Sequence, residues 1–207
     1  KEVMEAAGDD IAVLVKTNTR DGFKGGLEVD DCITVAKKLQ ELGAHCLVLS
    51  GGFVSKAPMY VMKGRMPMRT LWGYMPWKSL WWLKIGIAIG GKLMVKNEPF
   101  KEAFFYDDAI KFRKALDMPL AFVGGLNSVE AINKVMDAGF DFIQMARPLV
   151  HDPEFVNKLK EGKVTRSGCQ HANYCVARIW NYDMQCHEHC KVEKFQKKEL
   201  ERNIRKG

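Results

Sequence analysis

Short apolar runs alternate with amphipathic segments along most of this chain. Four runs rich in branched and aromatic residues, bounded by Gly, Asp or Pro, predict buried strands at 11–17, 46–50, 119–123 and 140–145. Apolar residues spaced three and four positions apart predict helices at 30–42 and 107–116 and between Ser128 and Gly139. Because the strands are continuously apolar, we expect a parallel α/β sheet with both faces covered.

Polar or glycine-containing turns follow the carboxyl end of each predicted strand. Asn18, Gly51, Gly124 and Arg147 lie at these four ends. Ligands of parallel α/β sheets bind at that edge, so these residues are candidates for a binding site. The alternative is that the Gly pairs at 51–52 and 124–125 only permit tight turns.

The net charge of +7 over 207 residues is unevenly distributed. The segment 56–101 contains nine basic residues, one acid and four of the five tryptophans, and the tail 191–207 contains seven basic residues and three acids. These segments carry +8 and +4, which leaves −5 for the rest of the chain. An apolar content of 47% excludes a disordered chain.

The basic segments suggest three classes of partner, namely nucleic acid, an anionic membrane surface or an acidic small ligand. The apolar stretch 81–93 is shorter than the ~20 residues that span a bilayer, and it predicts either an in-plane interfacial helix or a helix that covers the fold. The chain has no recognised nucleic-acid-binding motif, and the tail is interpreted as a solvated helix of mixed charge. We therefore predict no nucleic-acid partner, and 56–101 stays a candidate contact for an anionic membrane surface.

Two stretches of the chain carry a family resemblance. They are residues 119–162 (PLAFVGGLNSVEAINKVMDAGFDFIQMARPLVHDPEFVNKLKEG) and 13–52 (VLVKTNTRDGFKGGLEVDDCITVAKKLQELGAHCLVLSGG). In order and spacing, they resemble the C-terminal half of the old yellow enzyme-like family, the FMN-dependent NAD(P)H:flavin oxidoreductases. The resemblance implies an α/β fold, a (β/α)8 TIM barrel of which this chain holds strands 5–8. It predicts a half-barrel at 1–166, with a helical insertion at 56–101 after strand 6, and a Cys- and His-containing segment with a basic helix at 167–207.

The resemblance assigns an FMN-binding role to five residues. Gly124 and Gly125 let backbone N–H groups approach the FMN phosphate, and the following helix adds its positive end. Arg147 offers a bidentate fork to the phosphate, beside Ala146, where many relatives have Gly. Lys16, a charged residue in an apolar strand, is placed near the flavin N1–C2 edge, where a cation stabilises the reduced flavin, and it is the catalytic candidate. The alternatives are a surface ion pair for Arg147 and a carboxylate partner for Lys16.

The resemblance also implies an activity of ene-reductase or NADH:flavin oxidoreductase type. Hydride would pass from NAD(P)H, the co-substrate, through FMN to an electron-poor small-molecule acceptor. The substrate-binding residues of the family lie on the fourth strand, so we expect this chain to be a fragment that is inactive alone. It begins at Lys1 without a signal peptide, and we expect a cytoplasmic location. The alternatives are a basic, aromatic-rich protein that binds nucleic acid or a membrane surface, and a phosphate-binding barrel enzyme without flavin.

Four of the six cysteines gather near the C-terminus. Cys169, Cys175, Cys186 and Cys190 are spaced C-x5-C-x10-C-x3-C, with three histidines among them. Some relatives hold a [4Fe–4S] cluster on four cysteines nearby, but here Ala172 stands at the place of the second ligand. The spacing also matches no common structural zinc pattern. We predict reduced thiols that pack the C-terminal segment, and no metal.

Overall fold

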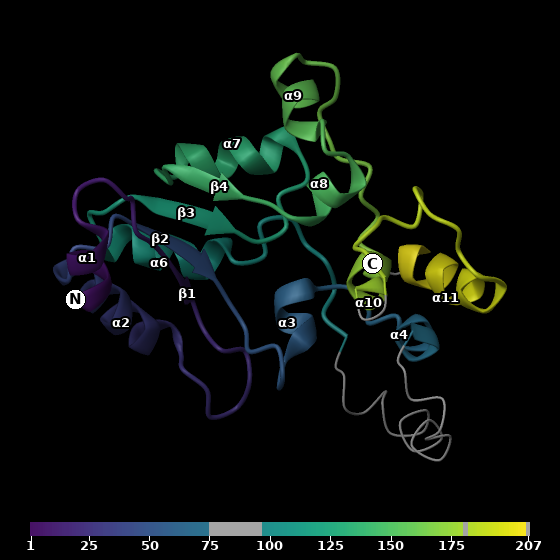
Figure 1. Ribbon diagram of the computed structural model, residues 1–207, viewed down its shortest axis with the longest axis horizontal. Coiled ribbons are helices and arrows are strands. Elements are labelled where there is room, and N and C mark those ends of the chain that lie inside the picture. Colours follow the sequence, from purple (N-terminus) through teal and green to yellow (C-terminus); the bar gives the residue numbers. More distant parts are fainter. Residues whose placement is uncertain (75–96, 180–181, 206–207) are drawn as a thin grey trace. The chain divides into compact units, whose positions relative to one another are not determined.

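The computed structural model divides the chain into two compact units. It describes residues 1–74, 97–179 and 182–205, so the helix predicted at 81–93 lies outside the described residues. Unit 1 consists of 1–61 and 101–145, and unit 2 of 62–100 and 146–207 (Figure 1). This division does not coincide with the boundary at 166 drawn from the sequence, because the insertion packs with the C-terminal segment.

Unit 1 is built on a four-stranded parallel sheet whose strands follow chain order. The strands are β1 (Leu14–Asn18), β2 (Cys46–Ser50), β3 (Leu120–Val123) and β4 (Phe142–Gln144) (Figure 1). The helices of this unit are α1 (Glu2–Ala7), α2 (Val29–Glu41), α6 (Tyr106–Ala115), α7 (Val129–Asp137) and most of α3 (Pro58–Met62). The predicted α/β class with a parallel sheet is thus confirmed.

The helices α2, α6 and α7 all pack on one face of this sheet. Leu47, Leu49, Leu120 and Phe122 lie in one buried core with apolar residues of these three helices. This arrangement follows from the strand order, since right-handed crossovers between successive neighbouring strands place every helix on the same side.

The opposite face of the sheet is mostly apolar and only partly covered. Its central residues, among them Val48 and Ala121, are buried in a separate small cluster. At the two edge strands, Leu14 and Phe142 are each 56% exposed. The expectation that both faces are covered along all strands was therefore wrong for β1 and β4. An apolar strand is suited to burial, but its sequence does not show whether this chain supplies the residues that would cover it.

Local signals place the helix ends of unit 1. Ser128 caps α7 by accepting a hydrogen bond from the backbone N–H of Ala131 at 3.2 Å, as predicted. Helix α2 begins with a reciprocal capping box between Glu28 and Asp31, and Gly43 follows its end with a φ of 86°. These short-range rules account for the close agreement between predicted and observed elements.

Unit 2 is helical in the residues that the structure describes. It contains α4 (Met68–Tyr74), α8 (Arg147–His151), α9 (Phe155–Lys160), α10 (Tyr174–Arg178) and α11 (Lys194–Arg205). Helix α4 packs against α10 and α11. Within the described ranges, we find no helix with the length and apolar character needed to cross a membrane.

Helix α11 corrects the interpretation of the tail as fully solvated. Gln196, Glu199 and Asn203 are buried, with exposed fractions of 0%, 4% and 1%. Their spacing of three and four residues puts them on one helical face, which packs on α4. This polar face is buried because the Glu199 carboxylate has specific hydrogen-bond partners on α4. The spacing of apolar residues, from which helix faces are predicted, does not detect a polar face of this kind.

Candidate functional site

The carboxyl edge of the unit 1 sheet contains a glycine pair built around an aromatic ring. Gly124 has a φ of 143° and Gly125 a φ of 70°, values that favour glycine. A Cβ at Gly124 would lie 3.0 Å from Cδ2 of Phe105, and the carbonyl of Gly125 accepts a hydrogen bond from the N–H of Ala103 at 3.2 Å. Tight packing against the Phe105 ring and backbone conformation therefore both require glycine at 124.

Lys16 lies on β1, on the less covered face of the same sheet. Its register partner is Val48, which in turn pairs with Ala121 of β3. The side chain is exposed and makes no ion pair with any residue that the structure describes. The carboxylate partner considered from the sequence is not seen among these residues, so the Lys16 charge remains available to a ligand at this face.

The positive end of α7 is already compensated. The hydroxyl of Ser128, its N-cap, donates to Oε2 of Glu102 at 2.7 Å. A carboxylate at a helix N-terminus is favourable and takes the place that an anion would use. The expected contribution of this helix end to phosphate binding is thus offset by Glu102, which the sequence analysis did not identify.

A second cation at the edge, Arg20, was also missed from the sequence. Its guanidinium donates to both carboxylate oxygens of Asp108, Nε and Nη2 each at 2.8 Å, and Nη1 lies 3.2 Å from Glu28. The Asp108 carboxylate raises the pKa of Arg20. Arg20 is therefore a structural cation that ties the loop after β1 to α6. Its partner lies 88 positions away, and no local pattern signals the pair.

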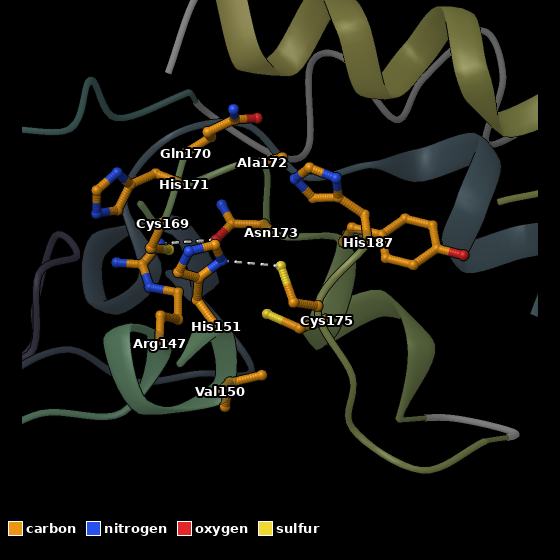
Figure 2. A pocket seen from close by; sticks show the side chains of 12 residues that line it. Arg147, Val150, His151, Cys169, Gln170, His171, Ala172, Asn173, Cys175 and His187 are labelled. Atoms are coloured by element: carbon orange, nitrogen blue, oxygen red, sulfur yellow. Dashed lines mark hydrogen bonds between the residues drawn. The ribbon is translucent and has the colours of Figure 1, made fainter. Parts of the chain in front are cut away.

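The functional candidate of unit 2 is Arg147, the first residue of α8. It lines a small cavity of about 20 Å³ together with His151, His171 and Cys175 (Figure 2). Burial lowers the pKa of Arg147. No carboxylate of the described residues pairs with its guanidinium. Ala146, just before the helix, is exposed.

Asn173 holds the Arg147 guanidinium in place. Nη1 of Arg147 donates to Oδ1 of Asn173 at 2.8 Å (Figure 2). The amide cannot turn over, because its Nδ2 donates to the carbonyls of Lys63 at 2.7 Å and Arg65 at 3.3 Å. Asn173 itself adopts a left-handed backbone with a φ of 57°, a conformation that Asn tolerates better than most residues. Arg147 is thus positioned by a neutral group and keeps its full charge.

An aromatic pair forms one wall beside Arg147. The rings of Phe100 and His171 stack with centroids 3.5 Å apart at 21°, and the guanidinium carbon lies 5.8 Å from the Phe100 centroid. Burial, followed by the charges of Arg147 and Arg166, lowers the pKa of His171 to about 3. His171 is therefore neutral at physiological pH and adds no second positive charge to the site.

The cysteines near this cavity are thiols rather than thiolates. Burial raises the pKa of Cys169, Cys175 and Cys186. The Cys186 sulfur lies 3.6 Å from Nδ1 of His151. In the part of the chain that the structure describes, no group of three His, Cys, Asp or Glu side chains is arranged to hold a metal ion.

Comparison with known proteins gives a consistent class of relatives. The chain is 36% identical over 179 residues to 4,4'-dithiodibutanoate disulfide reductase of Rhodococcus erythropolis, covering 86% of this chain and 43% of the relative. It is 23% identical over 164 residues to NADH oxidase of Thermoanaerobacter brockii, covering 79% of this chain and 20% of the relative. Both relatives are oxidoreductases. The chain thus spans less than half the length of each of these relatives, and no family model matches it.

Among solved structures, the chain resembles 2-naphthoyl-CoA reductase in its complex with 2-naphthoyl-CoA. The TM-score is 0.62 at 16% sequence identity, and the match covers 96% of this chain and 25% of the reductase chain. At this identity the match establishes a shared fold with one part of the reductase.

Proposed function

We propose that this chain is the phosphate-binding half of an FMN-dependent NAD(P)H oxidoreductase. The observation that carries the proposal is Arg147, a partly buried guanidinium that a neutral amide positions and that no described carboxylate neutralises. Such a cation suits an anionic group with several oxygens, and Arg is the side chain best matched to phosphate geometry. The oxidoreductase names of both relatives support the same assignment.

The arrangement of unit 1 supports the half-barrel part of the proposal. A sheet with strands in chain order and all crossover helices on one face is the geometry of a (β/α)8 barrel, whereas doubly wound sheets carry helices on both faces. The apolar second face, with Leu14 and Phe142 exposed at its edges, would become the barrel interior on pairing with strands 1–4. On this proposal, β1–β4 correspond to strands 5–8.

The residues present suit the proposed cofactor. Bound FMN would supply an isoalloxazine that takes a hydride from NAD(P)H and passes it to an acceptor. Arg147 would bind the phosphate and Ala146 would leave its backbone accessible, while Gly124 and Gly125 would admit the phosphate to the backbone of the β3 edge. Lys16 would place a positive charge beside the flavin ring and favour its anionic reduced form.

The acceptor is proposed to be a small electron-poor molecule. The relative named as a disulfide reductase makes an organic disulfide one candidate, beside an activated alkene. This chain holds only the residues of strands 5–8 on the proposed scheme, so we expect no turnover from it alone. We also propose a cytoplasmic location.

A comparison of FMN with riboflavin, which lacks the phosphate, tests the proposal. Flavin fluorescence should show that the purified chain binds FMN at least about tenfold more tightly than riboflavin, since Arg147 binds only the phosphate. Arg147→Met should abolish this preference. Lys160→Met, which removes an exposed charge at the end of α9, should retain it. Equal binding of FMN and riboflavin by the unmodified chain would refute the phosphate role.

A turnover assay tests the second part of the proposal. With NADH and either 4,4'-dithiodibutanoate or an enone, the chain plus FMN should oxidise NADH no faster than FMN alone. Sustained acceptor reduction by the chain would contradict the assignment of the missing catalytic residues to the other half of the barrel.

A further inference from the structure

A second pocket with positive walls lies where α4 meets α11 in unit 2. Arg69 from α4 and Lys198 and Arg202 from α11 line an open cavity of about 110 Å³, and Glu199 is the fourth described residue of its lining. We call this the α4–α11 pocket. It shares no lining residue with the cavity at Arg147, and the oxidoreductase proposal gives it no role.

Glu199 can offset only one of the three positive charges, and its oxygens are hydrogen-bonded to α4. Oε1 accepts from the N–H of Arg69 at 3.0 Å, and Oε2 accepts from the N–H of Thr70 at 2.9 Å and its hydroxyl at 3.2 Å. Of the cationic groups, Arg202 Nη2 lies 3.8 Å from Oε1, at the limit of an ion pair. Among the lining residues that the structure describes, three positive side chains against one carboxylate give a net charge of +2.

The cations have no other counter-charge in the described part of the molecule. Arg69 and Lys198 are exposed and form no ion pair with a described residue. Arg69 belongs to the basic segment 56–101, and Lys198 and Arg202 belong to the basic tail 191–207. Like charges gathered around one cavity repel each other, and a bound anion removes that repulsion.

We infer that the α4–α11 pocket binds a phosphate group in its dianionic form. A dianion matches the net charge of the wall, whereas a single carboxylate would leave one positive charge uncompensated. The two arginines supply planar forks for phosphate oxygens, and Lys198 supplies a mobile point charge. The cavity is large enough for several water molecules and hence for a phosphate group.

Titration with inorganic phosphate and pyrophosphate tests the inference. The full chain is used with Arg147→Met in the background, so that the first anion site is removed and failure of the FMN proposal leaves this test intact. Calorimetry should detect one phosphate site, weakened at least about tenfold by Lys198→Gln with Arg202→Gln, and weakened when NaCl rises from about 50 mM to about 300 mM. The two substitutions at Lys198 and Arg202 leave Glu199 and its contacts with α4 unchanged.

Lys197→Gln is the matched control, because Lys197 is exposed on the same helix and does not line the pocket. It should leave the affinity for phosphate within about twofold. Equal losses in the control and the double variant, or no loss in the double variant, would overturn the inference, as would acetate binding as tightly as phosphate.

Vesicles identify the source of the phosphate. The same proteins are sedimented with phosphatidylcholine vesicles with and without phosphatidic acid. Binding that needs both phosphatidic acid and the Lys198–Arg202 pair assigns a lipid headgroup, whereas binding of free phosphate without vesicle binding assigns a soluble phosphate compound. If the Lys198→Gln, Arg202→Gln double variant changes neither phosphate binding nor vesicle binding, a phosphate site in this pocket is refuted.

Discussion

Replacing Glu199 should release the first turn of α4. Glu199→Ala removes the acceptor of three donors, the N–H groups of Arg69 and Thr70 and the Thr70 hydroxyl. The carboxylate acts as an N-cap supplied by a distant helix, and loss of a cap costs about 0.5–2 kcal/mol. The unsatisfied hydroxyl adds about 1 kcal/mol. Part of this loss is offset because a buried charge is also removed, so we expect about 2 kcal/mol in all.

Hydrogen exchange measures this release where it occurs. A loss of about 2 kcal/mol corresponds to about 30-fold faster exchange of the amides of Arg69 and Thr70, if they exchange by local opening. Thr70→Val removes only the hydroxyl and should accelerate exchange about fivefold, matching about 1 kcal/mol. Glu201→Ala is the control, since Glu201 is exposed on the same helix and pairs only at 3.9 Å with Arg205.

The capping role of Glu199 fails if exchange at these two amides stays within twofold of the unmodified chain in Glu199→Ala. It also fails if Glu201→Ala accelerates exchange as much as Glu199→Ala. Either result would mean that α4 is held by its apolar packing and not by the carboxylate.

Three further predictions concern unit 1 and the wall at Arg147. His171 has a folded pKa of about 3 against 6.5 when unfolded, so below about pH 6.5 the unfolded state alone gains a proton and stability falls by about 1.4 kcal/mol per pH unit. His171→Phe should retain the stack with Phe100 and flatten this pH dependence in urea unfolding at about pH 7 and about pH 5; an unchanged slope would contradict the assignment. Gly124→Ala should cost about 2–3 kcal/mol in the same assay, and Gly162→Ala, with a positive φ but open space, about 1 kcal/mol; equal costs would show that the contact with Phe105 is unimportant. Lys16→Ala should weaken FMN binding or lower the reduction potential of bound flavin, and an unchanged flavin titration would remove Lys16 from the site.

The sequence predicted the four strands and the helices α2, α6 and α7 of unit 1 well because their signals are local. The strand at 46–50 matches β2 residue for residue, and Ser128 caps α7 as its spacing with the following apolar positions indicated. The strand at 11–17 begins later, at Leu14, because the first apolar residues precede the pairing with β2. Apolar period and cap residues are properties of a few neighbouring positions, and they persist in the fold.

The site was predicted only in part, because the contacts that define it are distant in sequence. Arg147 was identified from its place after a strand, but the fixed amide of Asn173 was not, and its partner Lys63 lies 110 positions away. The same holds for Glu199 and Thr70, 129 positions apart. A residue pattern shows that a position is polar, but it does not show which polar group will meet it.

The contact between Glu199 and Thr70 also bears on the order in which the protein is made. Unit 1 has all of its residues once position 145 has been synthesised, and its sheet can form while the ribosome is still at work. Unit 2 contains 62–100, but the carboxylate that caps α4 is added 129 residues after Thr70. Throughout that interval the α4 segment lacks its cap. A premature stop before α11 should therefore leave a folded sheet attached to an incompletely folded second unit, which proteases and chaperones should recognise.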